Sequence, residues 1–204
     1  EKKAKEYWDN YYDAMDEKSQ RVLYGGSEDG SILFREDFEN LDQRKLRVDD
    51  RDNQWYVKKG NNGNSMYCNK KVTSEDYAGF NLGGKNWRDY SISYRMKFTA
   101  GKGGELETHI RKKGNRQGEY RSVISNLTGT TELKFVKNAE KINQRIASGS
   151  SSKIEDKWAA IKLIASGNNI KYLVNNKVVA STKDDRVEKG AVMFAVTSKS
   201  ELCI

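Results

Sequence analysis

The sequence predicts an all-β protein, a two-sheet antiparallel β-sandwich preceded by a short N-terminal α-helix. Within residues 157–196, apolar and polar positions alternate along four short segments separated by turns rich in Gly and Asn. Residues 90–98 alternate without a break, and about a dozen such segments follow one another at a spacing of roughly 8–12 residues, as in sandwiches. Alternation with a period of two, broken by turn residues, is typical of antiparallel hairpins.

Length and charge limit the function classes. A chain of 204 residues can bury one sizeable core, and it contains no apolar run of the roughly 18 residues that a membrane-spanning helix requires. Residues 1–50 carry nine Lys/Arg against fourteen Asp/Glu, whereas residues 51–204 carry 28 against 15. The basic body favours polyanionic partners, although a solvated, Lys-rich surface explains the same composition.

The N-terminal region predicts one helix and a linker, over residues 1–24. Apolar side chains recur at helical spacing within residues 1–19, namely Ala4, Trp8, Tyr11, Tyr12 and Met15. We expect this helix to pack on the sandwich or to contact other protein subunits. The segment GGSEDGS, residues 25–31, predicts a flexible connector before the domain at 31–204. The chain starts at Glu1 without Met and stops in a strand-like segment at Ile204, which indicates a mature product or a trimmed chain, so the absence of a secretory signal says little.

The expected strands follow the alternation from Ile32 onward. In chain order they cover residues 31–40, 54–57, 65–69, 77–82, 90–98, 105–112, 119–126, 132–137, 141–147, 158–165, 170–175, 178–181 and 191–196. In the strand at 158–165, Ala159, Ile161, Leu163 and Ala165 form one side, and the residues between them form the other.

Cys68 and Cys203 are the only cysteines, and each lies in an expected strand among apolar neighbours. One disulfide would tie an early strand to the last one and would suit an oxidising compartment. Two small buried thiols explain the pattern equally well. A zinc site is not expected, since His109 is the only histidine.

Four segments, read in order, resemble the concanavalin A-like jelly-roll domains. They are FREDFEN, NWRDYSISYRMKF, HIRKKGNRQGEYRSVI and WAAIKLIASGNNIKYLVNNKVVASTKDD followed by KGAVMFAV, and the resemblance covers residues 31–204. The chain is most similar to domains grouped with 3-keto-disaccharide hydrolases, to laminin-G-like modules and to fructan-binding modules. The resemblance implies a jelly roll, a fold that hosts lectins, glycosidases and adhesive modules alike.

The resemblance also implies a sugar-binding surface on the concave sheet. Alternation predicts that Glu107, His109 and Arg111 share one strand face, with Arg95 on a neighbouring strand. Arg111 and Tyr120 match a paired Arg and Tyr in the resembling domains. Charged groups that bond vicinal hydroxyls, with a nearby ring, suit sugar recognition, and an ordinary solvated outer face is the alternative.

Metal binding is a weaker expectation. Lectin-like sandwiches often bind calcium through loop oxygens, for which the candidates here are Asp37, Glu39, Asp184 and Asp185. Solvated acidic turns explain these residues as well.

Enzyme activity is less expected than binding. The jelly-roll glucanases carry an E-x-D-x-x-E or E-x-D-x-E pattern along one strand, and this chain has no such pattern. A basic run at 111–121 contains a single aromatic residue, Tyr120, so nucleic acid is an unlikely partner and an acidic polysaccharide would fit the same charges.

These observations predict noncatalytic glycan binding by a secreted or cell-surface module. The alternatives are a structural or assembly module of a surface protein and a 3-keto-glycoside hydrolase.

Overall fold

The computed structural model is a β-sandwich, as the alternation predicts. It describes residues 23–27, 32–36, 55–59, 65–69, 78–82, 84–100, 103–114, 116–152, 154, 157–197 and 200–204. The predicted helix at 1–19 and the metal candidates Asp37 and Glu39 lie outside these residues. Among the described residues, no helix has the length and apolar character needed to cross a membrane.

Fifteen strands are described. In chain order they are β1 (Leu23–Ser27), β2 (Ile32–Glu36), β3 (Trp55–Lys59), β4 (Ser65–Asn69), β5 (Ala78–Leu82), β6 (Tyr90–Ala100), β7 (Glu105–Lys112), β8 (Glu119–Ser125), β9 (Thr130–Lys137), β10 (Ile142–Ser150), β11 (Ala159–Ser166), β12 (Asn169–Val174), β13 (Lys177–Lys183), β14 (Ala191–Thr197) and β15 (Glu201–Cys203). A 3₁₀ turn, Asn138–Glu140, connects β9 to β10.

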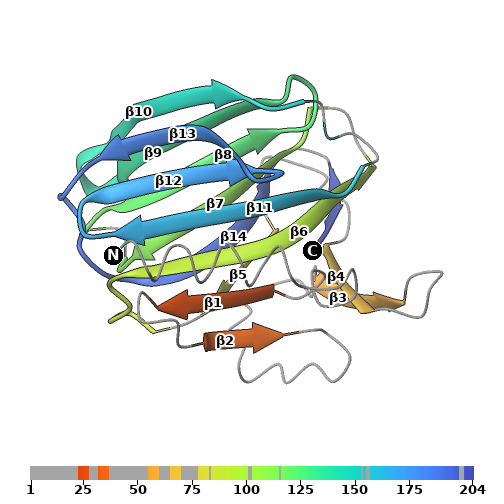
Figure 1. The fold of residues 1–204 in the computed structure, drawn as a ribbon, viewed down its shortest axis with the longest axis horizontal. Helices are drawn as coiled ribbons and strands as arrows, with labels where there is room; N and C mark the ends of the chain where they lie inside the picture. Colours follow the sequence, from red (N-terminus) through yellow and green to blue (C-terminus); the bar gives the residue numbers. More distant parts are fainter. Residues whose placement is uncertain are drawn as a thin grey trace.

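The strands form two antiparallel sheets that stack as two layers (Figure 1). The nine-stranded sheet runs β13-β12-β11-β6-β15-β4-β3. In addition, β1 pairs with β6, and β2 pairs with β1. The six-stranded sheet runs β10-β9-β8-β7-β14-β5. The long strand β6 pairs with β11 on one side and with both β1 and β15 on the other, so it joins the early and late parts of the chain.

Apolar side chains of both sheets meet between the layers. In the strand predicted at 158–165, the side formed by Ala159, Ile161, Leu163 and Ala165 faces the core, because all four residues are buried. An aromatic chain crosses the interface: Phe194 of β14 lies 4.9 Å from both Phe80 of β5 and Tyr94 of β6, measured between ring centroids. Stacked and edge-on rings add to the burial energy of such a core.

Most strand predictions hold within a few residues, but the connector prediction is wrong for residues 25–27. These residues belong to β1, which pairs with β6 from Tyr24↔Ser93 to Ser27↔Tyr90. The two Gly residues in this segment favoured a flexible linker in the sequence. They can nevertheless form a strand, because pairing with β6 uses backbone groups and needs no side chains.

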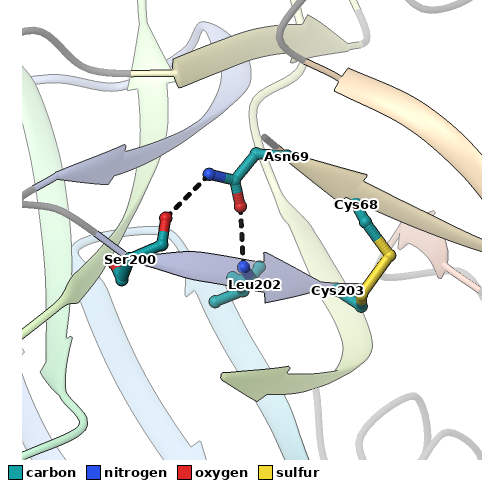
Figure 2. The surroundings of a disulfide bond; sticks show 5 residues. All are labelled: Cys68, Asn69, Ser200, Leu202 and Cys203. Carbon is teal, nitrogen blue, oxygen red and sulfur yellow. Dashed lines mark hydrogen bonds between the residues drawn. A yellow bond between two sulfur atoms is a disulfide. The ribbon is translucent and has the colours of Figure 1, made fainter. Parts of the chain in front are cut away.

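The two cysteines form a disulfide, which resolves the open alternative. Cys68 of β4 and Cys203 of β15 are direct cross-strand partners with a Cα–Cα distance of 4.1 Å, and Figure 2 shows their surroundings. Next to them, the buried Asn69 amide donates to Ser200 O at 3.0 Å and accepts from Leu202 N at 2.7 Å. The amide therefore extends the backbone pairing between β4 and β15 by one residue.

Removing the disulfide should lower the free energy of unfolding by up to about 5 kcal/mol, the loop-entropy limit for so long a loop. The bond joins residues 135 apart in sequence. Urea unfolding of the Cys68→Ala/Cys203→Ala variant would measure this loss. Dithiothreitol should lower the stability of the wild type to that of the variant and leave the variant unchanged. A wild-type midpoint insensitive to dithiothreitol would contradict the assignment.

Candidate functional site

The five ligand residues predicted from the sequence do not lie together. Glu107 and His109 share the outer face of the six-stranded sheet, that is, the face turned away from the nine-stranded sheet. Arg95 lies on β6 of the other sheet, where its guanidinium is 5.6 Å from the Trp158 ring centre. Arg111 and Tyr120 have buried side chains at one end of the sandwich.

A β-bulge explains the position of Arg111. Met193 of β14 pairs with His109, and Ala191 pairs with Lys112, so two residues of β7 stand opposite Val192. Arg111 has a φ of 53°, in the left-handed region. One extra residue reverses the alternation beyond it, so Arg111 turns inward and Lys112 takes the outward position. The prediction that Arg111 shares a face with Glu107 and His109 is therefore wrong.

The buried Arg111 guanidinium joins three segments of the chain. Its Nε donates to Arg88 O at 3.2 Å, Nη1 donates to Val187 O at 3.0 Å, and Nη2 lies 3.3 Å from Asp89 Oδ1. The backbone N of Arg111 donates to the buried Tyr90 hydroxyl at 2.7 Å. Since every guanidinium nitrogen has a partner inside the protein, Arg111 holds the fold together at this end.

Gly190 is required at the same end. A Cβ on Gly190 would come within 2.2 Å of the Arg111 carbonyl carbon, so only glycine allows β14 to approach the bulge this closely. The backbone N of Gly190 donates to Trp87 O at 2.9 Å.

Tyr120 and Asp184 also have structural partners. The Tyr120 hydroxyl donates to Asp184 Oδ1 at 2.7 Å and accepts from Val187 N at 3.1 Å. Arg186 Nε lies 3.0 Å from both Asp184 oxygens. Burial raises the pKa of the Asp184 carboxyl, but the hydrogen bonds from Arg186 and Tyr120 outweigh burial and hold the pKa below its usual value.

The described part of the chain does not bring together the oxygen ligands that the calcium prediction requires. Asp185 is exposed beside Asp184, whose oxygens are engaged by Arg186 and Tyr120. Within the described residues, no group of three or more His, Cys, Asp or Glu side chains could hold a metal ion.

An ion-pair network occupies the outer face of the six-stranded sheet. We call it the charged face, and it consists of Glu107, His109, Lys112, Glu119, Arg121, Glu132 and Lys134. These residues come from three neighbouring strands, β7, β8 and β9, and they occupy outward positions in the register. The side chains of His109 and Glu119 are nearly buried, whereas the others are 17–24% exposed.

His109 and Arg121 bridge two carboxylates at the centre of the charged face. His109 Nε2 is hydrogen-bonded to Glu107 Oε2 at 3.0 Å, and Nδ1 lies 3.0 Å from Glu119 Oε1. Arg121 donates to the same two oxygens, through Nη1 at 3.2 Å and Nε at 2.7 Å respectively. Lys112 Nζ is 3.0 Å from the second Glu119 oxygen.

The pKa values of the two bridged carboxyls follow from this geometry. Burial raises both, but the hydrogen bond and charge of His109 outweigh it, and Arg121 adds to the effect. The pKa of Glu107 is thus below its usual value, and that of Glu119, which Lys112 also contacts, is far below it. Both groups are therefore carboxylates near neutral pH, suited to accept hydrogen bonds.

The ligand set predicted from the sequence lacks five members of the charged face, and it also lacks Glu105, which lies beside them. Glu105 precedes Glu107 by two residues and shares its outward side, as the alternation could have shown. Burial raises the pKa of the Glu105 carboxyl above its usual value, and neighbouring Glu107 and Glu132 raise it further against the effect of Lys134. Lys112 could not have been found, because no sequence signal marks the bulge.

Comparisons with solved structures show the same fold. The chain is similar to the carbohydrate-binding module CBM66 from Bacillus subtilis, with a TM-score of 0.57 and 13% identity over 73% of this chain and 90% of the other. A Bacillus subtilis protein of unknown function with a galectin-like fold matches with a TM-score of 0.63 and 12% identity, over 85% and 93% of the two chains. A Bacillus licheniformis β-glucanase matches with a TM-score of 0.61 and 12% identity, over 87% and 94%.

No protein-family model matches the sequence, and no curated protein sequence matches it. The structural similarity confirms the concanavalin A-like jelly-roll fold, which the sequence resemblance implied.

Replacing the buried arginine should destabilise the protein. Arg111→Met leaves the Arg88 and Val187 carbonyls without donors, and we expect a loss of about 3 kcal/mol in the free energy of unfolding. Arg88→Met, which removes an exposed pair with Glu188, should cost less than about 1 kcal/mol. Urea unfolding followed by tryptophan fluorescence measures both losses, and equal losses would contradict the role assigned to Arg111.

The charged face should make stability depend on pH. The folded-state pKa of Glu119 lies below its unfolded value of about 4.3, so its stabilisation is complete above that pH and is lost as the pH falls. We expect the free energy of unfolding to decline from about pH 5 toward about pH 2. Urea unfolding across this range should show a shallower decline for Glu119→Gln and a wild-type decline for Glu188→Gln. An unchanged decline in Glu119→Gln would argue against the network.

Proposed function

We propose that this jelly-roll module binds a glycan without catalysis, through the charged face. One observation carries the proposal: carboxylate and cationic side chains alternate across three neighbouring strands while keeping part of their surface accessible. Sugar hydroxyls both donate and accept hydrogen bonds. Fixed carboxylates and guanidinium groups supply the complementary partners, and charged partners make the stronger bonds.

Preorganisation supports binding. The Glu107 side chain is held by Arg121 and His109, and Arg121 is also held by Glu119, so a ligand need not order them. A ligand therefore loses little affinity to side-chain ordering. Among the similar structures, one is a carbohydrate-binding module and another is a β-glucanase, which is consistent with a carbohydrate ligand.

The proposed ligand set differs from the one predicted from the sequence. Glu107 and His109 are retained, and the other members of the charged face replace Arg95, Arg111 and Tyr120. A secreted or cell-surface location remains part of the proposal, because the disulfide is of the kind that persists in oxidising compartments.

Glycoside hydrolysis is the second candidate, and the Glu105–Glu107 pair favours it. The two residues occupy successive outward positions of β7, which places their Cα atoms about 7 Å apart along the strand. The surroundings raise the pKa of Glu105 and lower that of Glu107, as an acid and a carboxylate would require. The glucanase pattern itself is absent, since β7 continues after Glu107 with Thr108, His109 and Ile110 and supplies no third carboxyl.

Glycan-array binding by the wild type and Glu107→Gln tests the proposal. The substitution preserves size but removes the charge that pairs with His109 and Arg121, and we expect binding to fall about tenfold, because bonds to charged groups are worth 1.5–3 kcal/mol. Lys137→Gln, which breaks the ion pair with Glu140 in the turn after β9 and leaves the contacts of the charged face intact, should bind like the wild type.

Three results would contradict noncatalytic binding by this face. They are binding by Glu107→Gln equal to that of the wild type, no glycan bound by the wild type, and release of sugar products that is lost in Glu105→Gln. The last result would favour the hydrolase.

A further inference from the structure

Two loops at one end of the sandwich form a basic hollow. The β5–β6 loop contributes Lys85 and Asn86, and the β7–β8 loop contributes Lys113, Gly114, Arg116 and Gln117. The hollow has a volume of about 520 Å³, and its lining contains three cations, two amides and no carboxylate.

The three cations differ from their basic neighbours in having no acidic partner among the described residues. Arg88, on the same loop as Lys85, lies 3.2 Å from Glu188, and Lys112, next to Lys113, lies 3.0 Å from Glu119. Within the described part of the chain, Lys85, Lys113 and Arg116 take part in no ion pair. Three uncompensated cations around one hollow repel one another and create a positive potential that an anion would neutralise.

The basic residues of the run at 111–121 have different surroundings in the structure. Arg111 is buried, and Lys112 and Arg121 are engaged by Glu119. Only Lys113 and Arg116 remain available from that run, and folding adds Lys85 from a loop about thirty residues earlier in the chain.

Both loops are held in place. Trp87 N donates to Gly84 O at 3.1 Å and closes the turn that carries Lys85, and Gln117 N donates to Gly114 O at 3.2 Å and closes the turn that carries Arg116. Arg111 precedes the second loop and donates to Arg88 O at the base of the first. The cations therefore project from two turns that share one buried anchor.

The hollow adjoins the charged face, because the loop between β7 and β8 belongs to the hollow. β7 ends at Lys112 and β8 begins at Glu119, and the loop between these two members of the charged face lines the hollow. A glycan lying on the charged face at the loop end of β7 and β8 would bring its next residues to the three cations.

We propose that the hollow is a subsite for the carboxylate or sulfate groups of an acidic glycan, an inference that rests on the glycan binding proposed above. Lys and Arg supply charged donors to such groups, and the Asn86 and Gln117 amides can bond to the neighbouring hydroxyls. A nucleic acid fits less well, because the lining contains no aromatic ring on which a base could stack.

The test compares binding of the full chain to immobilised dextran sulfate, polygalacturonate, neutral laminarin and single-stranded DNA. Lys113→Ala/Arg116→Ala should weaken binding to one or both acidic polysaccharides about tenfold, because each exposed charge pair contributes up to a few-fold. Lys177→Ala/Lys183→Ala removes the same charge from exposed positions of β13 and should change binding less than about twofold if the effect is local. Sulfate and carboxylate sources are distinguished by which of the two acidic polysaccharides responds.

The outcomes separate the inference from the proposed function. Equal losses in the two double variants, or tighter binding of DNA than of either acidic polysaccharide, would overturn the subsite. Glycan binding by the wild type, on the array or to laminarin, with no preference for acidic chains, would overturn the subsite and leave the proposed function standing. No binding to any glycan would overturn both.

Discussion

The arrangement of this end of the sandwich depends on one buried cation. Arg111 bonds to Arg88, Asp89 and Val187, which belong to the loop before β6 and the loop before β14. A guanidinium in the interior is tolerated only when its donors are satisfied, so its presence constrains both loops to positions where their carbonyls can accept. The bulge that turns Arg111 inward also turns Lys112 outward. One local change in β7 therefore determines the buried anchor, the last cation of the charged face and the base of the basic hollow.

The opposite side of the molecule is held by a different kind of constraint. The disulfide and the Asn69 amide beside it connect β15 to β4, a strand that lies much earlier in the sequence (Figure 2). The loop that the disulfide closes includes all of β5 to β14. A covalent closure of that length restricts the unfolded chain and so stabilises the fold.

The charged face and the basic hollow have different electrostatic characters. On the charged face, each carboxylate is matched by His109, Arg121 or a lysine, so the surface is polar but locally balanced. The hollow carries three cations, and the described part of the chain places no matching carboxylate beside them. A balanced network favours neutral hydroxyl groups through directed hydrogen bonds, whereas an uncompensated cluster favours charge. This contrast is the reason for assigning the two regions to different parts of one ligand.

The sequence by itself determined the sandwich and most of its strands. Side-chain alternation is a local property, which is why Ala159, Ile161, Leu163 and Ala165 could be placed on one side of a strand, and why Glu107 and His109 could be placed on one face. The pairing of Cys68 with Cys203, the approach of Lys85 to Arg116 and the reversal at Arg111 depend on contacts between segments distant in sequence or on one inserted residue in a strand. Alternation with a period of two does not indicate where a bulge occurs. A single extra residue nevertheless moves every later side chain to the other face. The local pattern therefore predicted the fold class, whereas the pairing of the strands determined which residues form the proposed binding surface.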